Sequence, residues 1–179
     1  MFDHDASRHV PPPHGPEGAK TCLEYTVYGT QYVANTSYEV AVPDKYVKFT
    51  NLGWGTYAGY TDTNAEVHLE LDGIANTVWV GDVGPWNIDD NYWNPASGAR
   101  PRRMFSDLPQ GYPESEAAYY DGYNGGLDQY GRTVTNPAAL DQSLDVATAM
   151  GLAYLANAWI TVTYLWECTE DPDLDGDGY

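Results

Sequence analysis

Short runs of residues that favour β-structure follow one another along the first half of the chain. They are rich in β-branched and aromatic side chains, and apolar and polar positions partly alternate within them. Alternation with a period of two is typical of strands that bury one face. The pattern predicts strands over residues 23–28, 38–42, 46–50, 65–71 and 77–80, the last two joined by a turn at Asp72-Gly73.

The segment from residue 84 to residue 136 breaks this pattern. It is rich in Trp, Tyr, Asn, Gly and Pro, and its helical candidate is at residues 113–120, where a proline is followed by acidic residues. A connection of this length within one domain is usually functional or disordered, and the aromatic content argues against disorder. We therefore expect an ordered loop that forms the wall of a groove.

An amphipathic helix is predicted after this loop, with Ser143 as its N-cap and Gly151 as its stop signal. A final strand is predicted over residues 159–166, with alternate side chains on opposite faces. The apolar positions at near-helical spacing are Leu140, Leu144, Ala147, Met150 and Leu152, and one face of the final strand carries Ile160, Val162, Tyr164 and Trp166.

The size of the chain fits one folded domain. With 179 residues, 42% of them hydrophobic, it can bury one ordinary core. No apolar stretch approaches the roughly 18 residues of a membrane span, so we expect no membrane-spanning segment. We expect a disordered leader over residues 1–20, a β-rich domain over 21–167 and an acidic tail over 168–179.

The charge of the chain argues against nucleic acid as a partner. Lys and Arg number 8 against 26 Asp and Glu, a formal net charge of −18 that would repel phosphates. The few basic residues are partly concentrated at Arg100, Arg102 and Arg103. We interpret this cluster as a solvated loop with ion pairs, with binding of an anionic group as the alternative.

Two cysteines lie near the two ends of the predicted domain. Cys22 precedes the first predicted strand and Cys168 follows the last. A disulfide between them would close a long loop and contribute on the order of 4 kcal/mol. Such a bond favours secretion over the cytosol, where the pair would stay reduced. The alternative is two unrelated thiols.

Two aspartates occur beside residues that force a fixed turn. Asp82 stands in Gly81-Asp82-Val83-Gly84-Pro85-Trp86, after a predicted strand, and Asp141 follows Asn136-Pro137-Ala138-Ala139-Leu140, before the predicted helix. Functional groups often project at such element ends. Paired carboxylates suggest acid–base chemistry on a sugar. Hydrogen bonding to turn amides or helix capping is the alternative for each.

These motifs resemble those of the double-psi β-barrel superfamily, which includes expansins, rare-lipoprotein-A-like lytic transglycosylases, barwin and family 45 glycoside hydrolases. The resemblance covers roughly residues 77–166, and includes Asp90 to Trp93, Tyr123-Asn124-Gly125-Gly126 and Gly131 to Asp141. In the first half it reaches only Tyr28-Gly29-Thr30. It implies a mainly β fold, a six-stranded double-psi β-barrel with a long loop insertion and one or two short helices.

The same resemblance implies roles for the two aspartates. Asp82 would face a sugar cleft as a general acid, and Asp141 would be an organiser or second carboxylate. One of the two carboxyls must then stay protonated near neutral pH, through burial or repulsion from its neighbour.

Aromatic side chains in the loops complete the expected sugar site, because the apolar face of a pyranose packs on flat rings. Core filling is the alternative for each ring. We interpret His68 as a satisfied strand histidine, with a base near Asp82 as the alternative. The expected substrate-binding residues are Trp54, Tyr57, Trp86, Tyr92, Trp93 and Tyr123.

The tail has aspartates at every second position followed by glycine, as in loops that bind calcium. It resembles the opening of a thrombospondin type 3 or dockerin-like repeat. No acidic ligand follows at the twelfth position, so a solvated acidic tail or the cut edge of a longer protein is the alternative. Apart from calcium at this tail, we expect no required cofactor. The expected calcium ligands are Asp171, Asp173, Asp175 and Asp177.

Three functions fit these observations. The first is a secreted, extracellular or cell-surface protein that binds polysaccharide, either neutral glycan or peptidoglycan, and remodels cell walls without requiring hydrolysis. The second is a glycan-cleaving enzyme, either a lytic transglycosylase or a family 45-like endoglucanase. The third is a barwin-like or inhibitor-like module whose loop aromatics contact protein instead of sugar.

Overall fold

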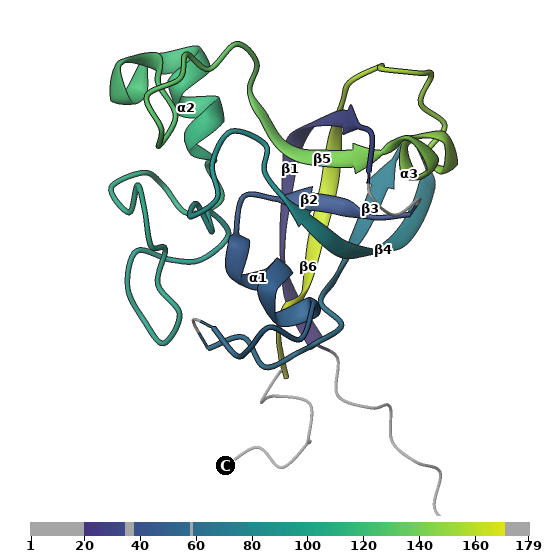
Figure 1. Ribbon diagram of the computed structural model, residues 1–179, viewed down its shortest axis with the longest axis horizontal. Helices are drawn as coiled ribbons and strands as arrows, with labels where there is room; N and C mark the ends of the chain where they lie inside the picture. The colour runs from purple at the N-terminus through teal and green to yellow at the C-terminus, as the bar shows by residue number, and fades with distance from the viewer. Residues whose placement is uncertain (1–19, 35–37, 58, 171–179) are drawn as a thin grey trace, which may run out of the picture. The chain divides into compact units, whose positions relative to one another are not determined.

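Six strands of the chain close into a β-barrel (Figure 1). The computed structural model describes residues 20–34, 38–57 and 59–170. The strands are β1 (Lys20–Tyr32), β2 (Val40–Val42), β3 (Glu66–Leu71), β4 (Ile74–Val83), β5 (Ala138–Ser143) and β6 (Ala158–Glu170). The helices are α1 (Lys45–Asn51), α2 (Glu114–Asp121) and α3 (Leu144–Ala149), with a 3₁₀ turn, η1, at Tyr123–Gly126. The expected mainly β fold with a six-stranded barrel is confirmed, with three short α-helices instead of one or two.

The order of strands around the barrel differs from their order in the sequence. Neighbours run β1, β5, β2, β4, β3, β6. The pairs β1–β5 and β2–β4 are parallel, whereas β2–β5, β3–β4 and β3–β6 are antiparallel. Parallel neighbours cannot be joined by tight hairpins. Segments distant in the sequence therefore meet at β5, β2 and β4.

The final strand follows its predicted alternation. Ile160, Val162 and Tyr164 are fully buried, and Trp166 is nearly so. On the opposite face, Trp159 and Leu165 are exposed. A strand with this alternation buries one continuous apolar face. That face packs in the core, while the backbone of β6 pairs with β3.

One predicted strand is wrong. Residues 46–50 lie in α1, although their aromatic and β-branched composition favours a strand. Asp44 caps the helix by accepting a hydrogen bond from the backbone N–H of Tyr46 at 3.0 Å. Val47 and Thr50 are buried, and their spacing of three residues is that of a helix face.

The predicted helix after Pro137 is shorter than its apolar spacing suggests. Leu140 lies in β5, so the helix begins only after Ser143, whose Oγ accepts from the backbone N–H of Val146 at 3.4 Å. The predicted N-cap is therefore confirmed. The helix at 113–120 is also confirmed, as α2, with Pro113 at its N-cap.

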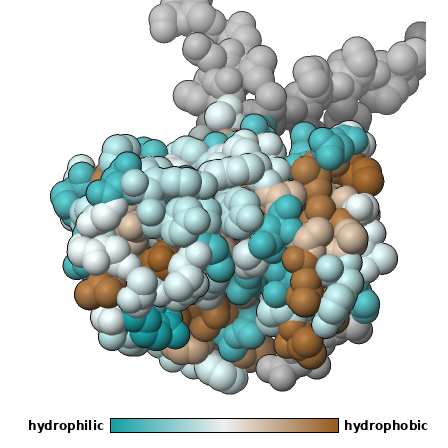
Figure 2. All heavy atoms as spheres, turned by 90° about the horizontal axis from the view of Figure 1, so that it is seen from above, coloured by the Kyte–Doolittle hydropathy of each residue, from teal (hydrophilic) through white to brown (hydrophobic). Residues whose placement is uncertain are grey.

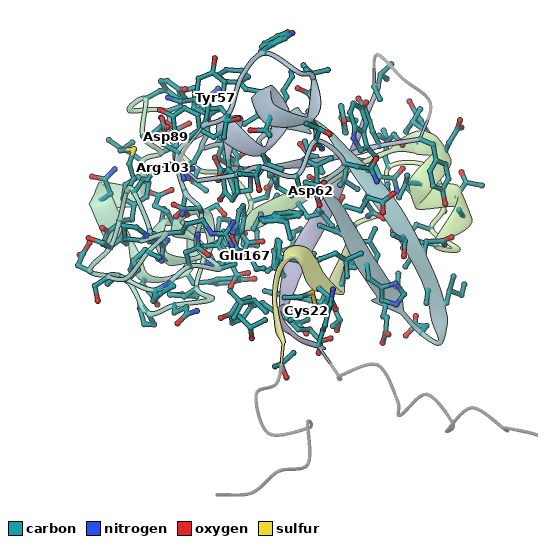
Figure 3. All side chains as sticks on the ribbon, turned by 90° about the horizontal axis from the view of Figure 1, so that it is seen from below. Cys22, Tyr57, Asp62, Asp89, Arg103 and Glu167 are labelled. Atoms are coloured by element: carbon teal, nitrogen blue, oxygen red, sulfur yellow. A yellow bond between two sulfur atoms is a disulfide. The ribbon has the colours of Figure 1, made fainter. Side chains whose placement is uncertain are left out.

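A disulfide joins the two ends of the barrel domain. Cys22 and Cys168 are bonded across 146 residues, as the sequence predicted. They bound the compact unit Cys22–Cys168, and Cys22 is labelled at the lower part of β1 in Figure 3. A second unit consists of Met1–Thr21 and Thr169–Tyr179. In its described part, the Thr169 hydroxyl lies 3.4 Å from the carbonyl oxygen of Thr21.

One face of the molecule is mainly polar. Figure 2 shows one face on which hydrophilic residues cover most of the area and hydrophobic residues gather toward one side. The longest α-helix in the described part of the chain has 8 residues, too short to cross a bilayer.

Candidate functional site

Barrel closure brings the two predicted aspartates together. Ala41 on β2 pairs with Asp82 on β4 and with Asp141 on β5. The two aspartates therefore flank one strand, with their Cα atoms about 10 Å apart, two strand spacings. The charge of Asp82 acts on Asp141, so the pair predicted from separate motifs forms one electrostatic unit.

Asp141 receives a hydrogen bond from β1. Thr30 and Asp141 are register partners in the parallel β1–β5 pair, and the Thr30 hydroxyl donates to Asp141 Oδ1. Burial raises the pKa of Asp141 above its ordinary value, the Thr30 hydrogen bond opposes this rise, and the charge of Asp82 adds to it. The result is a carboxyl with an increased tendency to hold its proton.

Asp82 instead forms an ion pair. Lys48 on α1 lies with its Nζ 2.5 Å from Asp82 Oδ1. The backbone N–H of Val83 donates to the same oxygen at 2.9 Å. One carboxylate oxygen of Asp82 therefore already contacts the Lys48 ammonium and the backbone N–H of Val83. In the described residues, no lysine or arginine forms an ion pair with Asp141.

An open groove lies beside Asp141. Its volume of about 480 Å³ falls in the range of roughly 300–1,000 Å³ that is usual for small-molecule sites. Thr30 and Asp141 form part of its wall, whereas Asp82 is outside the groove lining. The other lining groups include Gln31, Trp86, Arg132 and Asn136. The groove thus combines a carboxyl, an aromatic ring, amides and one guanidinium.

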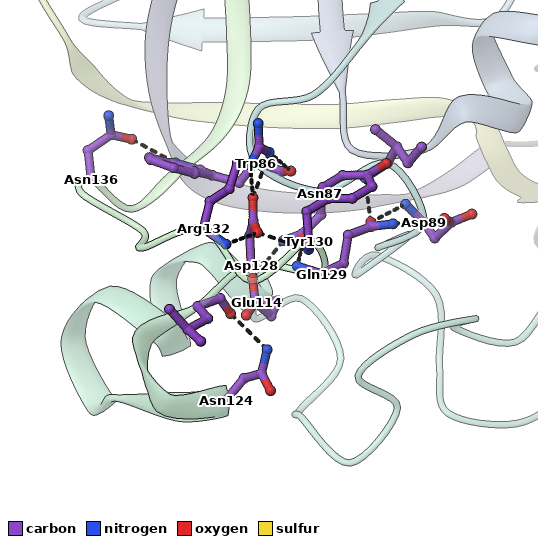
Figure 4. Close-up of polar contacts among 12 residues, drawn as sticks. Trp86, Asn87, Asp89, Glu114, Asn124, Asp128, Gln129, Tyr130, Arg132 and Asn136 are labelled. Carbon is purple, nitrogen blue, oxygen red and sulfur yellow. Dashed lines mark hydrogen bonds and ion pairs between the residues drawn. The ribbon is translucent and has the colours of Figure 1, made fainter.

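The aromatic wall of the groove is Trp86, whose backbone and side chain both make contacts within the protein. It has a positive φ of 59° and follows the cis Gly84–Pro85 bond. Its indole N–H donates to Asn136 Oδ1 at 3.1 Å, and Arg132 donates to its carbonyl oxygen at 2.6 Å (Figure 4). The Arg132 guanidinium also lies 5.9 Å from the centre of the indole ring. The ring is therefore held in one position.

A polar network orders the long loop behind Trp86. Asp128 accepts from the backbone N–H of Arg132 at 2.8 Å and from its Nε at 2.6 Å. Asn87 accepts from the backbone N–H of Gln129 and donates to Glu114 at 2.6 Å (Figure 4). Burial raises the pKa of Glu114 to about 7. The expected ordered loop that walls a groove is therefore observed.

Gln31 fixes the opposite wall. Its amide nitrogen donates to the carbonyl oxygens of Ala153 at 2.8 Å and Ala156 at 2.6 Å. Its amide oxygen accepts from the backbone N–H of Leu155 at 2.9 Å. These three hydrogen bonds hold the loop that contributes Asn157 to the groove.

The six predicted substrate-binding aromatics separate into four places. Trp86 lines the groove, and Trp54 and Tyr57 lie on the α1 side of the barrel. Tyr123 packs against Phe105 with its hydroxyl on Asp107. Tyr92 and Trp93 are fully buried against Tyr164, so neither has an exposed face for a sugar in this structure.

The predicted arginine cluster forms ion pairs, but it is not uniformly solvated. Arg102 is buried with Asp90, its Nε 2.7 Å from the carboxylate. Arg100 pairs with Glu167 at 2.6 Å, and Arg103 pairs with Asp44. Each arginine therefore holds a loop in place.

His68 belongs to the barrel wall. It pairs with Thr77 in the β3–β4 ladder, and its Nδ1 lies 3.1 Å from the Thr77 hydroxyl. Thr77 precedes Asp82 by five residues on β4, a distance of about 17 Å along a strand. The interpretation of His68 as a satisfied strand histidine is supported.

Four groups of the site were not assigned from the sequence: Thr30, Gln31, Lys48 and Arg132. Lys48 belongs to a segment that was predicted as a strand. Arg132 lies within a motif that carries the resemblance, but neither that motif nor the one ending at Thr30 indicated a role for these side chains. The predicted calcium ligands lie outside the described residues, as does most of the predicted leader. In the described ranges, no group of three or more His, Cys, Asp or Glu is arranged to hold a metal.

Comparison with protein families shows that the chain belongs to the family described as "Domain of unknown function (DUF8814)", whose model matches residues 21–163. Comparison with curated proteins and with solved structures gives no match.

Proposed function

We propose that this protein is a secreted double-psi β-barrel that binds polysaccharide in the Asp141 groove and remodels cell walls. The observation that carries the proposal is the juxtaposition of Thr30, Asp141 and Trp86 around one open groove. A fixed indole can stack on the apolar face of a sugar ring, while the amides and the carboxyl bond its hydroxyls. The closed barrel with two parallel strand pairs and the disulfide support the fold and the secretion in this proposal.

Within this proposal, Asp141 takes the role that the sequence favoured for Asp82. Asp141 lines the groove and its pKa is raised, whereas Asp82 is occupied by Lys48. Asp82 then supports Asp141 electrostatically. Its negative charge, two strands away, makes ionisation of Asp141 less favourable.

The raised pKa of Asp141 favours glycan cleavage as a second candidate function. The Asp141 carboxyl would donate its proton to the glycosidic oxygen as the bond from that oxygen to the anomeric carbon breaks. Either water or a hydroxyl of the same sugar would then attack the anomeric carbon and lose a proton. The first course is hydrolysis and the second is lytic transglycosylation.

A pull-down on insoluble cellulose, chitin and peptidoglycan, with soluble products measured in the same tubes, tests both functions. We expect the parent to bind at least one polymer and Trp86→Ala to bind it several-fold less. Product from the parent and from Asp82→Asn, but not from Asp141→Asn, would establish an enzyme with Asp141 as its acid. Binding without product supports a non-hydrolytic glycan protein. Absence of both would refute the proposal and favour a protein-binding module.

A further inference from the structure

Four aromatic side chains gather on α1 and the loop after it, apart from the groove. We call this cluster the α1 platform; it consists of Tyr46, Phe49, Trp54 and Tyr57. Tyr46 and Tyr57 stack with ring centroids 5.6 Å apart, and Phe49 contacts Trp54 at 5.3 Å and Tyr57 at 5.6 Å. None of the four lines the groove.

Trp54 is the outermost ring of the platform. It is 61% exposed, and its neighbour Leu52 is also exposed. Its backbone N–H donates to the carbonyl oxygen of Phe49 at 3.0 Å, and its own carbonyl accepts from the Tyr57 hydroxyl at 3.2 Å. A large ring that is both exposed and anchored on ordered neighbours provides a flat contact surface at low entropic cost.

The charges beside the platform are paired within the protein. The guanidinium of Arg103 lies 4.7 Å and the ammonium of Lys45 5.1 Å from the centre of the Tyr46 ring. Arg103 pairs with Asp44, and Lys45 lies 2.7 Å from Asp89. Figure 3 shows Tyr57, Asp89 and Arg103 close together at one edge of the barrel.

These ion pairs limit which kind of ligand the platform can bind. Each cation beside the rings has an acidic partner, and so does Lys48 on the same helix, which is bound to Asp82. The platform therefore offers apolar ring surface without an unpaired cation for an anionic ligand. The chain's net charge of −18 disfavours anionic partners further. An uncharged ligand with one apolar face is complementary to such a surface.

We propose that the α1 platform is a second carbohydrate-binding surface, on which Trp54 stacks against the apolar face of a neutral glycan. The choice of a glycan rests on the function proposed for the groove. Because the platform and the groove are separate, the platform would retain the protein on an insoluble polymer independently of Asp141 and Trp86. It therefore contributes to adsorption and leaves the chemistry of the groove unchanged.

Adsorption isotherms on insoluble cellulose and chitin test this proposal with the full chain. Trp54→Ala removes the ring from an exposed position, and Trp54→Phe keeps a smaller one. The matched control is Tyr120→Ala, because Tyr120 is 56% exposed on α2 and lies outside both the platform and the groove lining. Far-ultraviolet circular dichroism and thermal unfolding verify that each variant is folded.

We expect Trp54→Ala to weaken adsorption about 2- to 13-fold, since a stacked ring contributes about 0.5–1.5 kcal/mol. Trp54→Phe should retain part of the affinity, and Tyr120→Ala should bind like the parent. Unchanged adsorption of Trp54→Ala beside a loss in Trp86→Ala would overturn the platform and leave the groove proposal standing. An equal loss in Tyr120→Ala would also overturn it, because the adsorption would then be nonspecific. If the parent binds neither cellulose nor chitin, the platform proposal is refuted. If the parent does not bind peptidoglycan either, the groove proposal is refuted as well.

Discussion

Glu116 makes the stability of the protein depend on pH. This glutamate lies on α2, is 7% exposed, and has its Oε1 without a hydrogen-bond partner among the described residues. Burial raises its pKa from the ordinary 4.5 to about 7, and a hydrogen bond from the backbone of Tyr28 opposes the rise. Between these two values the unfolded chain is ionised while the folded protein still holds the proton. The contribution of Glu116 to stability is therefore fully present below about pH 4.5, decreases as pH rises toward 7, and is absent above that.

The expected magnitude follows from linkage. A rise in the pKa of Glu116 from 4.5 to about 7 corresponds to a stabilisation of about 3 kcal/mol in acid. About 2.5 kcal/mol of this stabilisation is lost between pH 5 and pH 8. Glu116→Gln removes the ionisable group and keeps an oxygen that can accept from Tyr28. The variant should resemble the parent within about 1 kcal/mol at pH 5. At pH 8 it should be more stable than the parent by up to about 3 kcal/mol.

Urea unfolding at pH 5 and pH 8, with the disulfide intact, measures this difference. Glu24→Gln is the matched control, because Glu24 is an exposed glutamate on β1 whose hydrogen-bond partner is the hydroxyl of Thr163. Its stability relative to the parent should change by less than about 0.5 kcal/mol between the two pH values. If the stability gain of Glu116→Gln is the same at pH 5 and pH 8, the assignment of a buried, late-ionising carboxyl is refuted.

Three other predictions concern the barrel and the groove. Thr30→Val removes the hydrogen bond that lowers the pKa of Asp141, so that pKa should rise further, as carbon-detected NMR titration of the carboxyl would show. Reduction of the bond between Cys22 and Cys168 reopens a loop of 146 residues; unfolding with and without reductant should differ by up to about 5 kcal/mol. Gln31→Ala removes three hydrogen bonds from the adjoining groove loop, and hydrogen exchange there should accelerate about 10-fold or more while exchange in the barrel core stays unchanged.

The strands were predictable where the side-chain period was clear. Residues 160–164 alternate between apolar and polar side chains, and the structure places them in β6 with the predicted faces. Residues 46–50 were wrongly predicted as a strand because their residue types and the spacing of their buried positions disagree. The residue types favour a strand, while the buried pair Val47 and Thr50 follows a helical spacing. Tertiary packing and the Asp44 cap decide the conformation there.

The strand β5 was not predicted from the sequence, for a different reason. Residues 138–143 form β5, yet Leu140 also fits the apolar spacing of the helix that follows. Short apolar runs cannot be assigned from periodicity alone. Parallel pairing with β1 and antiparallel pairing with β2 stabilise the strand, and neither partner is close in sequence.

Only the site residues that stand beside turn motifs could be predicted from the sequence. Asp82 and Asp141 stand beside glycine and proline residues that restrict the backbone, which made both recognisable. Their partners Thr30 and Lys48 come from a distant strand and from the helix mistaken for a strand. Non-local register, set by barrel closure, decides which group faces which carboxyl, and no local pattern encodes it.

Glycines beside the site link its chemistry to the packing of the barrel. Gly29 precedes Thr30, and a Cβ at Gly29 would lie 2.6 Å from the Cδ1 of Ile160. Gly81 precedes Asp82, and a Cβ there would collide with the carboxylate of Glu39. Because successive strand residues point to opposite faces, each glycine permits close packing on one side while the next residue projects from the other. A side chain at either glycine would therefore have to displace the end of the Ile160 or Glu39 side chain beside the site.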